Sequence, residues 1–204
     1  MSYVVTLSGS PAARSRSTHL LRVAEDALRA HGVAVRRIDA RELPAASLMH
    51  ADFDDPAVRE ALKLVDQAQA VIIATPLYKA SYSGLLKSFL DLLPRRALAH
   101  KPVLPFATGG SLAHLLALDY ALKPVLASLG ARHVLDNVFA TERDMQAVDG
   151  AYAVTDAIAQ RLADAIESLV HVLDDAATLR SLRDGRRMNN EGHTRETDLF
   201  RALS

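Results

Sequence analysis

Hydroxyls and a positive charge follow the first apolar run of the chain, residues 3–7. The stretch 8–18 reads SGSPAARSRST, and its polar side chains stand immediately before a helical pattern: Ser10, Ser15, Arg16 and Ser17. A helix N-terminus offers unpaired N–H groups and a partial positive charge, which together stabilise an anion. Hydroxyls and a guanidinium add further donors, so the turn suits a phosphate monoester. Alternatively, Ser17 or Thr18 only caps the helix and Arg16 is solvated.

Two familiar phosphate motifs are missing from the sequence. No G-x-x-x-x-G-K-[ST] occurs, and no G-x-G-x-x-G follows the first apolar run. A P-loop nucleotidase and a dinucleotide-binding Rossmann site are therefore not indicated. A hydroxyl-rich loop that holds one terminal phosphate points instead to a site for flavin mononucleotide (FMN) of the flavodoxin type.

Two later apolar runs also end in unusual residues. The run 70–76 ends in ATPLYKASYSG, where Pro76 stiffens the turn and Tyr78 and Tyr82 supply flat surfaces. The run 102–110 ends in ATGGS, and Gly109 and Gly110 let the backbone approach a ligand closely. These loops could supply N–H donors and flat contacts to a planar isoalloxazine ring. Ordinary half-buried tyrosines and ordinary turn glycines are the alternatives.

The elements that must position these loops alternate between strand and helix. Apolar runs predict strands at 3–7, 33–40, 70–76, 102–110 and 132–140. Helical periodicity predicts helices at 18–32, 57–68, 84–94, 111–130 and 155–173, with a loop at 41–56. Alternation of this kind predicts an α/β fold with helices on both faces of a parallel sheet, where ligands bind beyond the carboxyl ends of the strands. The expected fold is flavodoxin-like, with five strands in the order 2-1-3-4-5.

The chain is expected to form one domain over residues 1–173, followed by a polar, arginine-rich tail over 174–204. The tail loses the apolar periodicity, so it is expected to be flexible. Packing of the tail on a sister subunit is the alternative.

Composition excludes several classes of function. The 204 residues contain 24 Lys and Arg against 24 Asp and Glu, so the net charge is zero and no nucleic-acid partner is expected. Without cysteine there is no disulfide, thiolate nucleophile or thiolate metal ligand. The histidines show no metal-ligand spacing, so no metal site is expected. No signal pattern or membrane-spanning run is present, and a cytoplasmic protein with no membrane association is expected.

Four segments together resemble one family. SGSPAARSRS, ATPLYKASYSGLLKSFLDLLP, PFATGGSLAHLLALDYALKPVL and VFA resemble the NADPH-dependent FMN reductases of two-component alkanesulfonate monooxygenase systems, over roughly residues 3–170. The resemblance implies a tetramer that uses FMN as a substrate with NADPH as reductant. It also implies a partner, an FMNH2-dependent alkanesulfonate monooxygenase that desulfonates organosulfonates.

The resemblance assigns flavin contacts to three loops. The phosphate turn would use Ser10, Ser15, Arg16 and Ser17; one edge of the flavin would meet Pro76, Leu77, Tyr78 and Lys79; the other side would meet Thr108, Gly109, Gly110 and Ser111. The family often has an arginine directly after its GSP, where this chain has Ala12, and Arg14 is the candidate substitute.

The predicted helix 111–130 contains a proline that must disturb it. Pro124 has no N–H, so the carbonyl of Tyr120 loses its partner, and a kink or a π-bulge is the usual result. In the resembling reductases a tyrosine at this place lies in a π-helical segment at the subunit interface. Tyr120 is therefore assigned to flavin release. Aromatic packing without a kinetic role is the alternative.

Hydride transfer from NADPH to a flavin needs no protein acid or base, so no catalytic residue is assigned. Cations that could meet the 2′-phosphate of NADPH are Arg16, Lys79, Arg95 and Arg96. Two rival functions remain on the same fold. One is a reductase of quinones, azo dyes or chromate that retains its FMN, and the other is a flavodoxin-like electron carrier.

Overall fold

The structure is a computed structural model that describes residues 2–148 and 151–201. The chain divides into two compact units, Met1–Leu169 and Val170–Ser204. The first unit contains the sheet and everything that bears on the predicted site.

A parallel sheet forms the centre of the first unit. Its main strands are β1 (Val4–Ser8), β2 (Val35–Asp39), β3 (Ala70–Tyr78) and β5 (Pro102–Gly109), followed by the short strands β6 (His133–Val134) and β7 (Val138–Thr141). The order is β2-β1-β3-β5-β6, and β7 also pairs with β5. Strand for strand, this is the predicted order 2-1-3-4-5, so the flavodoxin-like fold class is confirmed.

The fifth strand differs from its prediction because it is interrupted. β6 pairs His133 with Pro102, whereas β7 pairs Val138 with Phe106, so residues 135–137 face only residues 104–105 of β5. One extra residue in one strand is a β-bulge. It lies opposite Pro105, which has no N–H to donate to a neighbour.

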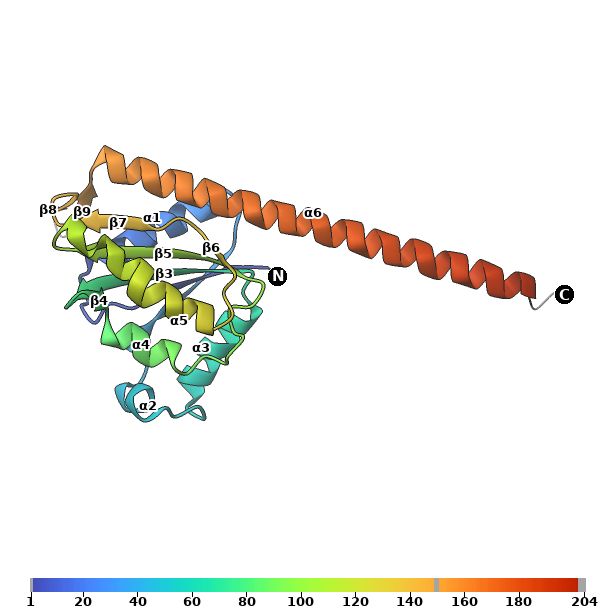
Figure 1. The fold of residues 1–204 in the computed structure, drawn as a ribbon, viewed down its shortest axis with the longest axis horizontal. Helices are drawn as coiled ribbons and strands as arrows, with labels where there is room; N and C mark the ends of the chain where they lie inside the picture. Colours follow the sequence, from blue (N-terminus) through green and yellow to red (C-terminus); the bar gives the residue numbers. More distant parts are fainter. Residues whose placement is uncertain (1, 149–150, 202–204) are drawn as a thin grey trace. The chain divides into compact units, whose positions relative to one another are not determined.

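Helices cover both faces of the sheet. Helix α1 (Arg16–Ala30) and the beginning of α6 (Asp156–Arg201) lie on one face; α3 (Pro56–Gln67), α4 (Gly84–Leu90) and α5 (Lys123–Ser128) lie on the other (Figure 1). The second face holds a continuous apolar cluster that includes Val58, Phe89 and Leu126. On the first face, Leu21 and Leu162 are buried. Burial on both sides explains why the central strands read as unbroken apolar runs.

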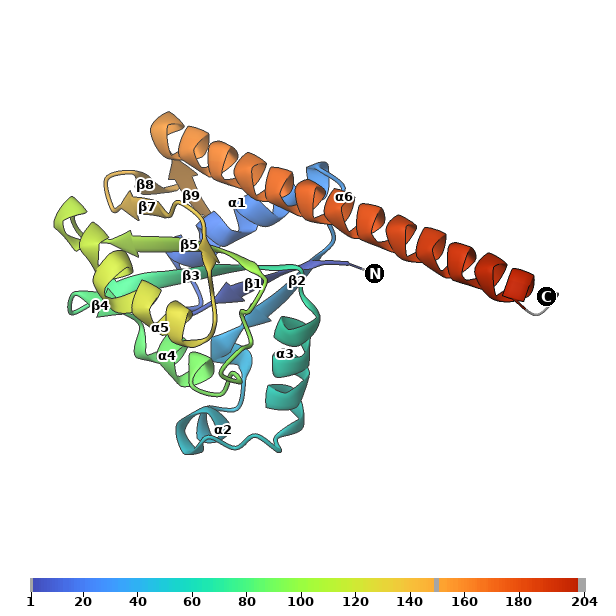
Figure 2. The same cartoon turned by 45° about the vertical axis from the view of Figure 1, so that its right-hand side comes forward.

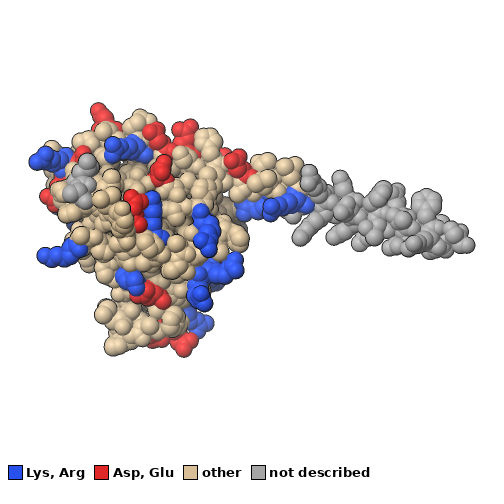
Figure 3. Space-filling model, viewed as in Figure 1, with Lys and Arg blue, Asp and Glu red and all other residues tan. Residues whose placement is uncertain are grey.

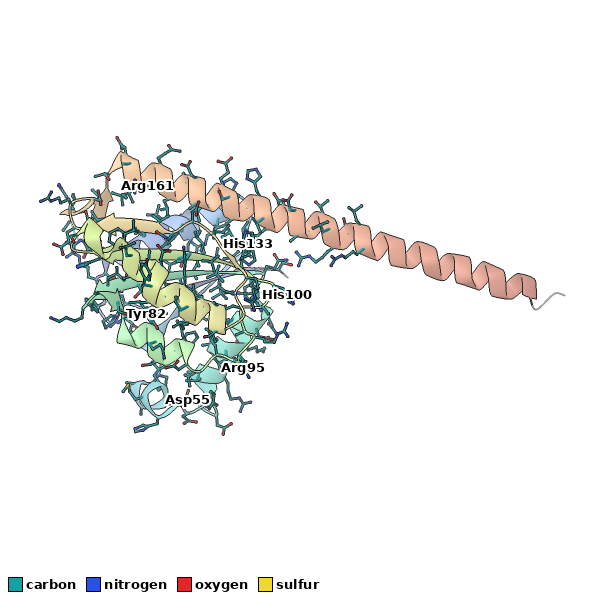
Figure 4. The ribbon with its side chains drawn as sticks, in the orientation of Figure 1. Asp55, Tyr82, Arg95, His100, His133 and Arg161 are labelled. Atoms are coloured by element: carbon teal, nitrogen blue, oxygen red, sulfur yellow. The ribbon has the colours of Figure 1, made fainter. Side chains whose placement is uncertain are left out.

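Three helical segments differ clearly from the sequence prediction. The predicted loop 41–56 contains a 3-10 turn, η1 (Ala40–Glu42), and the short helix α2 (Ala45–His50). Asp55 lies between α2 and α3, where it caps α3 and accepts a hydrogen bond from Ser47 of α2 (Figure 4). Helix α4 ends at Leu90 rather than residue 94. The sequence predicts an end at residue 173 for the last helix, whereas α6 continues to Arg201. The flexibility of residues 174–204 stays a prediction.

The predicted distortion near Pro124 is confirmed. Residues 111–130 do not form one helix but a 3-10 turn, η2 (Leu112–Leu115), a π-helical segment, η3 (Leu118–Leu122), and α5. The N–H of Lys123 donates to the carbonyl of Leu118, five residues earlier, which is the π-helical pattern. Leu118 and Leu122 are buried, while Tyr120 is 79% exposed.

A β-hairpin that the sequence prediction omitted follows β7. Its strands are β8 (Met145–Val148) and β9 (Ala151–Val154), paired antiparallel. Strands β3, β5 and β7 point toward the side of this unit where β4 (Ser81–Tyr82) and the hairpin lie (Figure 2). The hairpin therefore stands at the edge of the sheet where the predicted site lies.

Basic and acidic side chains are interspersed on the face of the first unit that Figure 3 shows. No helix within the described part of the chain is both long and apolar enough to cross a membrane.

Candidate functional site

A cleft of about 170 Å³ lies at the carboxyl ends of β1, β3 and β5. Nine of the twelve predicted flavin contacts line it: Ser10, Ser15, Arg16, Pro76, Leu77, Tyr78, Thr108, Gly109 and Gly110. The other three, Ser17, Lys79 and Ser111, do not line it, and their contact with a flavin stays a prediction. The cleft is also lined by Ala12, Arg14, Glu142 and Tyr152.

The first wall of the cleft is the turn between β1 and α1. Ser15 is the N-cap of α1, and its hydroxyl accepts a hydrogen bond from the N–H of Thr18 at 3.4 Å. Ser17 is buried, with its hydroxyl 2.9 Å from that of Ser15. The capping role that the sequence offered to Ser17 or Thr18 thus belongs to Ser15. Ser17 supports the cap rather than facing the cleft.

Buried hydrogen bonds fix this turn against the loop that follows β3. The hydroxyl of Ser83, the N-cap of α4, donates to the carbonyl of Gly9 and accepts from the N–H of Leu86. The N–H of Ser83 donates in turn to the hydroxyl of Thr75 at 3.0 Å. A Cβ on Gly9 would lie 2.6 Å from the Cβ of Leu86, so only glycine allows this approach of the turn to α4. The first two walls of the cleft therefore form one rigid unit.

The second wall ends in a strained hairpin turn. Tyr78 pairs with Ser81, so Lys79 and Ala80 are the two turn residues between β3 and β4. Their φ angles are +50° and +61°, values that fit a type I′ turn and are costly for residues with a Cβ. Such strain persists only where the surrounding structure enforces it, and it often accompanies ligand contact.

The two tyrosines of this loop have different environments. Tyr78 is exposed and lines the cleft. Tyr82 of β4 instead packs against the apolar cluster near α4 and α5 (Figure 4), and burial raises its pKa. The sequence suggested both tyrosines as contacts to an isoalloxazine ring, but only Tyr78 lines the cleft.

The third wall is the end of β5. Thr108 is buried, and a Cβ on Gly109 would lie 3.1 Å from the Phe139 ring, so a larger residue there would have to shift this ring. A Cβ on Gly110 would meet nothing within 4 Å. The backbone of Gly110 is therefore open to a ligand, beside Thr108 and Gly109, which also line the cleft.

The fourth wall comes from the hairpin, and sequence reasoning missed it. Glu142 follows β7, and Tyr152 lies on β9. Asp149-Gly150 is a dipeptide typical of two-residue hairpin turns, and it could have revealed this element. The turn itself lies outside the described residues.

Tyr152 brings two arginines of the first wall together. The guanidinium carbons of Arg14 and Arg16 lie 5.9 Å and 5.5 Å from the centre of its ring, within the range of cation–π contacts. The rings of Tyr152 and His19 also pack edge to face, with their centres 5.8 Å apart. Burial and the nearby Arg22 lower the pKa of His19, which favours the neutral imidazole beside these cations. Arg14 thus lies at the cleft, where the sequence named it as a substitute for the arginine that Ala12 replaces.

These walls fit the chemistry of FMN. The turn before α1 offers a helix N-terminus, the Ser10 and Ser15 hydroxyls and two guanidinium groups, which suit a phosphate. Tyr78, Leu77 and the accessible Gly110 backbone offer flat apolar contact and polar groups to a ring. Among the described residues no cluster of His, Asp or Glu could hold a metal ion.

Comparisons with known proteins agree with this chemistry. Residues 2–146 match a family model described as NADPH-dependent FMN reductase. A protein of Pseudomonas putida KT2440 named FMN reductase (NADPH) is 49% identical over 167 residues, which cover 81% of this chain and 85% of that protein. A protein of Escherichia coli K12 with the same name is 50% identical over 146 residues, which cover 72% of this chain and 75% of that protein. Among solved structures, the apo form of the NADH:FMN oxidoreductase EmoB matches with a TM-score of 0.75 at 40% identity, covering 83% of this chain and 88% of that one.

Proposed function

Since the chain belongs to the NADPH-dependent FMN reductase family, we propose that it supplies reduced FMN to a partner monooxygenase that desulfonates organosulfonates. The predicted family, the predicted enzyme class and the predicted cofactors, FMN and NADPH, are confirmed. When bound, FMN supplies the hydride-accepting chemistry. The residues of the chain bind and orient it.

One observation carries the proposal. Three loops that are far apart in sequence meet at one cleft; the first supplies hydroxyls and guanidinium groups, and the other two supply Leu77, Tyr78 and accessible backbone. A phosphate and a planar ring joined by a short chain need these two environments side by side. Arg14, Arg16 and Ser10 would hold the phosphate, while Leu77, Tyr78 and Gly110 would contact the ring.

Steady-state turnover tests the proposal. The purified full chain should oxidise NADPH slowly by itself and much faster when free FMN is added, and gel filtration should leave little flavin on the protein. A purified FMNH2-dependent alkanesulfonate monooxygenase added to the same mixture should then release sulfite from an alkanesulfonate. Retained flavin with a rate that does not depend on added FMN would instead identify a reductase that keeps its FMN. A rate of zero under both conditions would remove the enzyme proposal altogether.

The preference for NADPH over NADH and a cytoplasmic location belong to the proposal. NADPH is supported by the names of the two relatives that are about half identical, whereas the EmoB structure is named for NADH. Comparison of kcat/KM for the two nucleotides measures this preference directly.

We also propose that the chain forms a tetramer with the π-helical segment at a subunit interface. Two large apolar side chains in and beside this segment, Leu116 and Tyr120, are exposed. Exposed apolar groups that lie close together are common at protein contacts. Sedimentation of the purified protein would measure the assembly size.

Tyr120→Ala should change the rate at which FMN leaves the protein while affecting folding little. The reason is that Tyr120 is exposed and lies outside the cleft, so it acts through the segment and its contacts rather than by binding flavin. Stopped-flow dissociation of FMN measures the rate, and urea unfolding measures the stability. Equal dissociation rates in the variant and the parent would assign Tyr120 to packing alone.

A further inference from the structure

Arg16 is held by the hairpin segment through three separate contacts. Its Nη1 donates to Oε1 of Glu142 at 3.1 Å, and its Nε donates to the carbonyl oxygen of Met145 at 3.3 Å. The Tyr152 ring lies over the guanidinium. All three partners are more than a hundred residues away in sequence, so the fold and not the local chain places them there.

These contacts occupy the positions that a phosphate would use. A guanidinium can bind an oxyanion through two nitrogens in two ways. One way uses Nε and the neighbouring Nη, and the other uses the two Nη nitrogens. Nε already donates to Met145, and Nη1 already donates to Glu142. Each of these pairs of nitrogens therefore has one member engaged by the protein itself. Nη1 carries two N–H groups, so a phosphate that binds through the one facing Glu142 must displace this carboxylate, and a phosphate that binds through the other shares the guanidinium with it.

Glu142 is the partner that a phosphate can displace. Its side chain is 64% exposed, compared with 33% for Arg16, so the released carboxylate can return to water at small cost. Its backbone is fixed, because the carboxylate of Asp144 accepts hydrogen bonds from the N–H and the hydroxyl of Thr141, both at 2.7 Å. Even when displaced, Glu142 stays close enough to repel a phosphate dianion.

We propose that Glu142 is a built-in competitor for the flavin phosphate and lowers the affinity of the cleft for FMN. The proposal rests on the proposed function, in which FMN binds as a substrate and its reduced form must leave. A carboxylate that takes Arg16 back when the phosphate departs favours release. It also makes the effect specific for the phosphorylated flavin, since riboflavin has no group that meets Arg16.

Flavin binding to the full-length Glu142→Gln variant tests the proposal. Glutamine keeps the size of the side chain and removes its charge. The dissociation constant for FMN, measured by fluorescence quenching, should fall by about threefold to fivefold, the size of a surface charge interaction. The dissociation constant for riboflavin should not change. Higher salt should reduce the gain for FMN, because exposed charges are screened.

Glu60→Gln is the matched control. Its side chain is also 64% exposed and forms a surface ion pair, with Lys63 at 3.8 Å, but it does not line the cleft. It should bind both flavins like the parent.

Three outcomes would overturn the proposal. Weaker FMN binding by Glu142→Gln would mean that Glu142 positions Arg16 for the phosphate. An unchanged FMN affinity would mean that the ion pair has no influence, and an equal gain for riboflavin would mean that the effect does not involve the phosphate. If the parent itself binds neither flavin, the proposed function fails and the competitor role fails with it, whereas normal binding with no difference between variants removes the competitor role alone.

Discussion

Arg16→Ala should weaken FMN binding by about 10-fold to 100-fold, because a hydrogen bond to a charged group contributes about 1.5–3 kcal/mol. The substitution removes the one guanidinium at the cleft that is fixed by both Glu142 and Met145. It also leaves the carboxylate of Glu142 without its cation at the place where the phosphate binds, which adds repulsion. Titration of FMN into the variant and the parent measures the change.

Riboflavin separates loss of the phosphate contact from damage to the cleft. The variant should bind riboflavin about as well as the parent does. Arg59→Ala is a suitable control, because Arg59 is exposed on α3 and does not line the cleft. Unchanged FMN affinity in Arg16→Ala would falsify the assignment of the phosphate to this turn.

Glu25→Ala should lower the free energy of unfolding by about 1.5–3 kcal/mol, the usual contribution of hydrogen bonds to a charged group, because Glu25 is buried. The carboxylate of Glu25 accepts a hydrogen bond from the hydroxyl of Thr6 at 2.6 Å and pairs with Arg37 Nη1 at 3.4 Å. Thr6 on β1 and Arg37 on β2 are register partners, so one carboxylate from α1 ties two strands to the helix. Its loss leaves Arg37, which has a buried Nη2 without a partner, paired with Asp39 through Nε at 2.9 Å.

Asp26→Ala is the matched control for this prediction. Asp26 is the next residue on α1 and also pairs with Arg29, but its side chain is 78% exposed, compared with 5% for Glu25. Its removal should change the free energy of unfolding by less than about 0.5 kcal/mol. Urea unfolding of the two variants and the parent measures both effects. A similar small change in both would show that Glu25 contributes no more than a surface charge.

The sequence alone determined the sheet, its order and most of the cleft. Apolar runs and helical periodicity are local properties, so they identified the strands whose carboxyl ends meet at one edge. The distortion of residues 111–130 was also predictable, because a proline removes a hydrogen bond within its own helix whatever surrounds it. In the same way, nine of the twelve predicted contacts line one cleft because they lie in the last residues of β3 and β5, or between the end of β1 or β5 and the first residue of the next helix.

Only the tertiary structure decided what faces Arg16. The N-cap of α1 is Ser15, whereas the sequence suggested Ser17 or Thr18. The fourth wall of the cleft comes from residues near the hairpin, which no residue near the phosphate turn predicts. Glu142 and Met145 reach Arg16 across separations of 126 and 129 residues. Periodicity shows which side of an element is buried, but contacts between distant polar side chains depend on how packed elements are placed against each other. That placement is a property of the folded chain as a whole, and it decided which charges share the cleft.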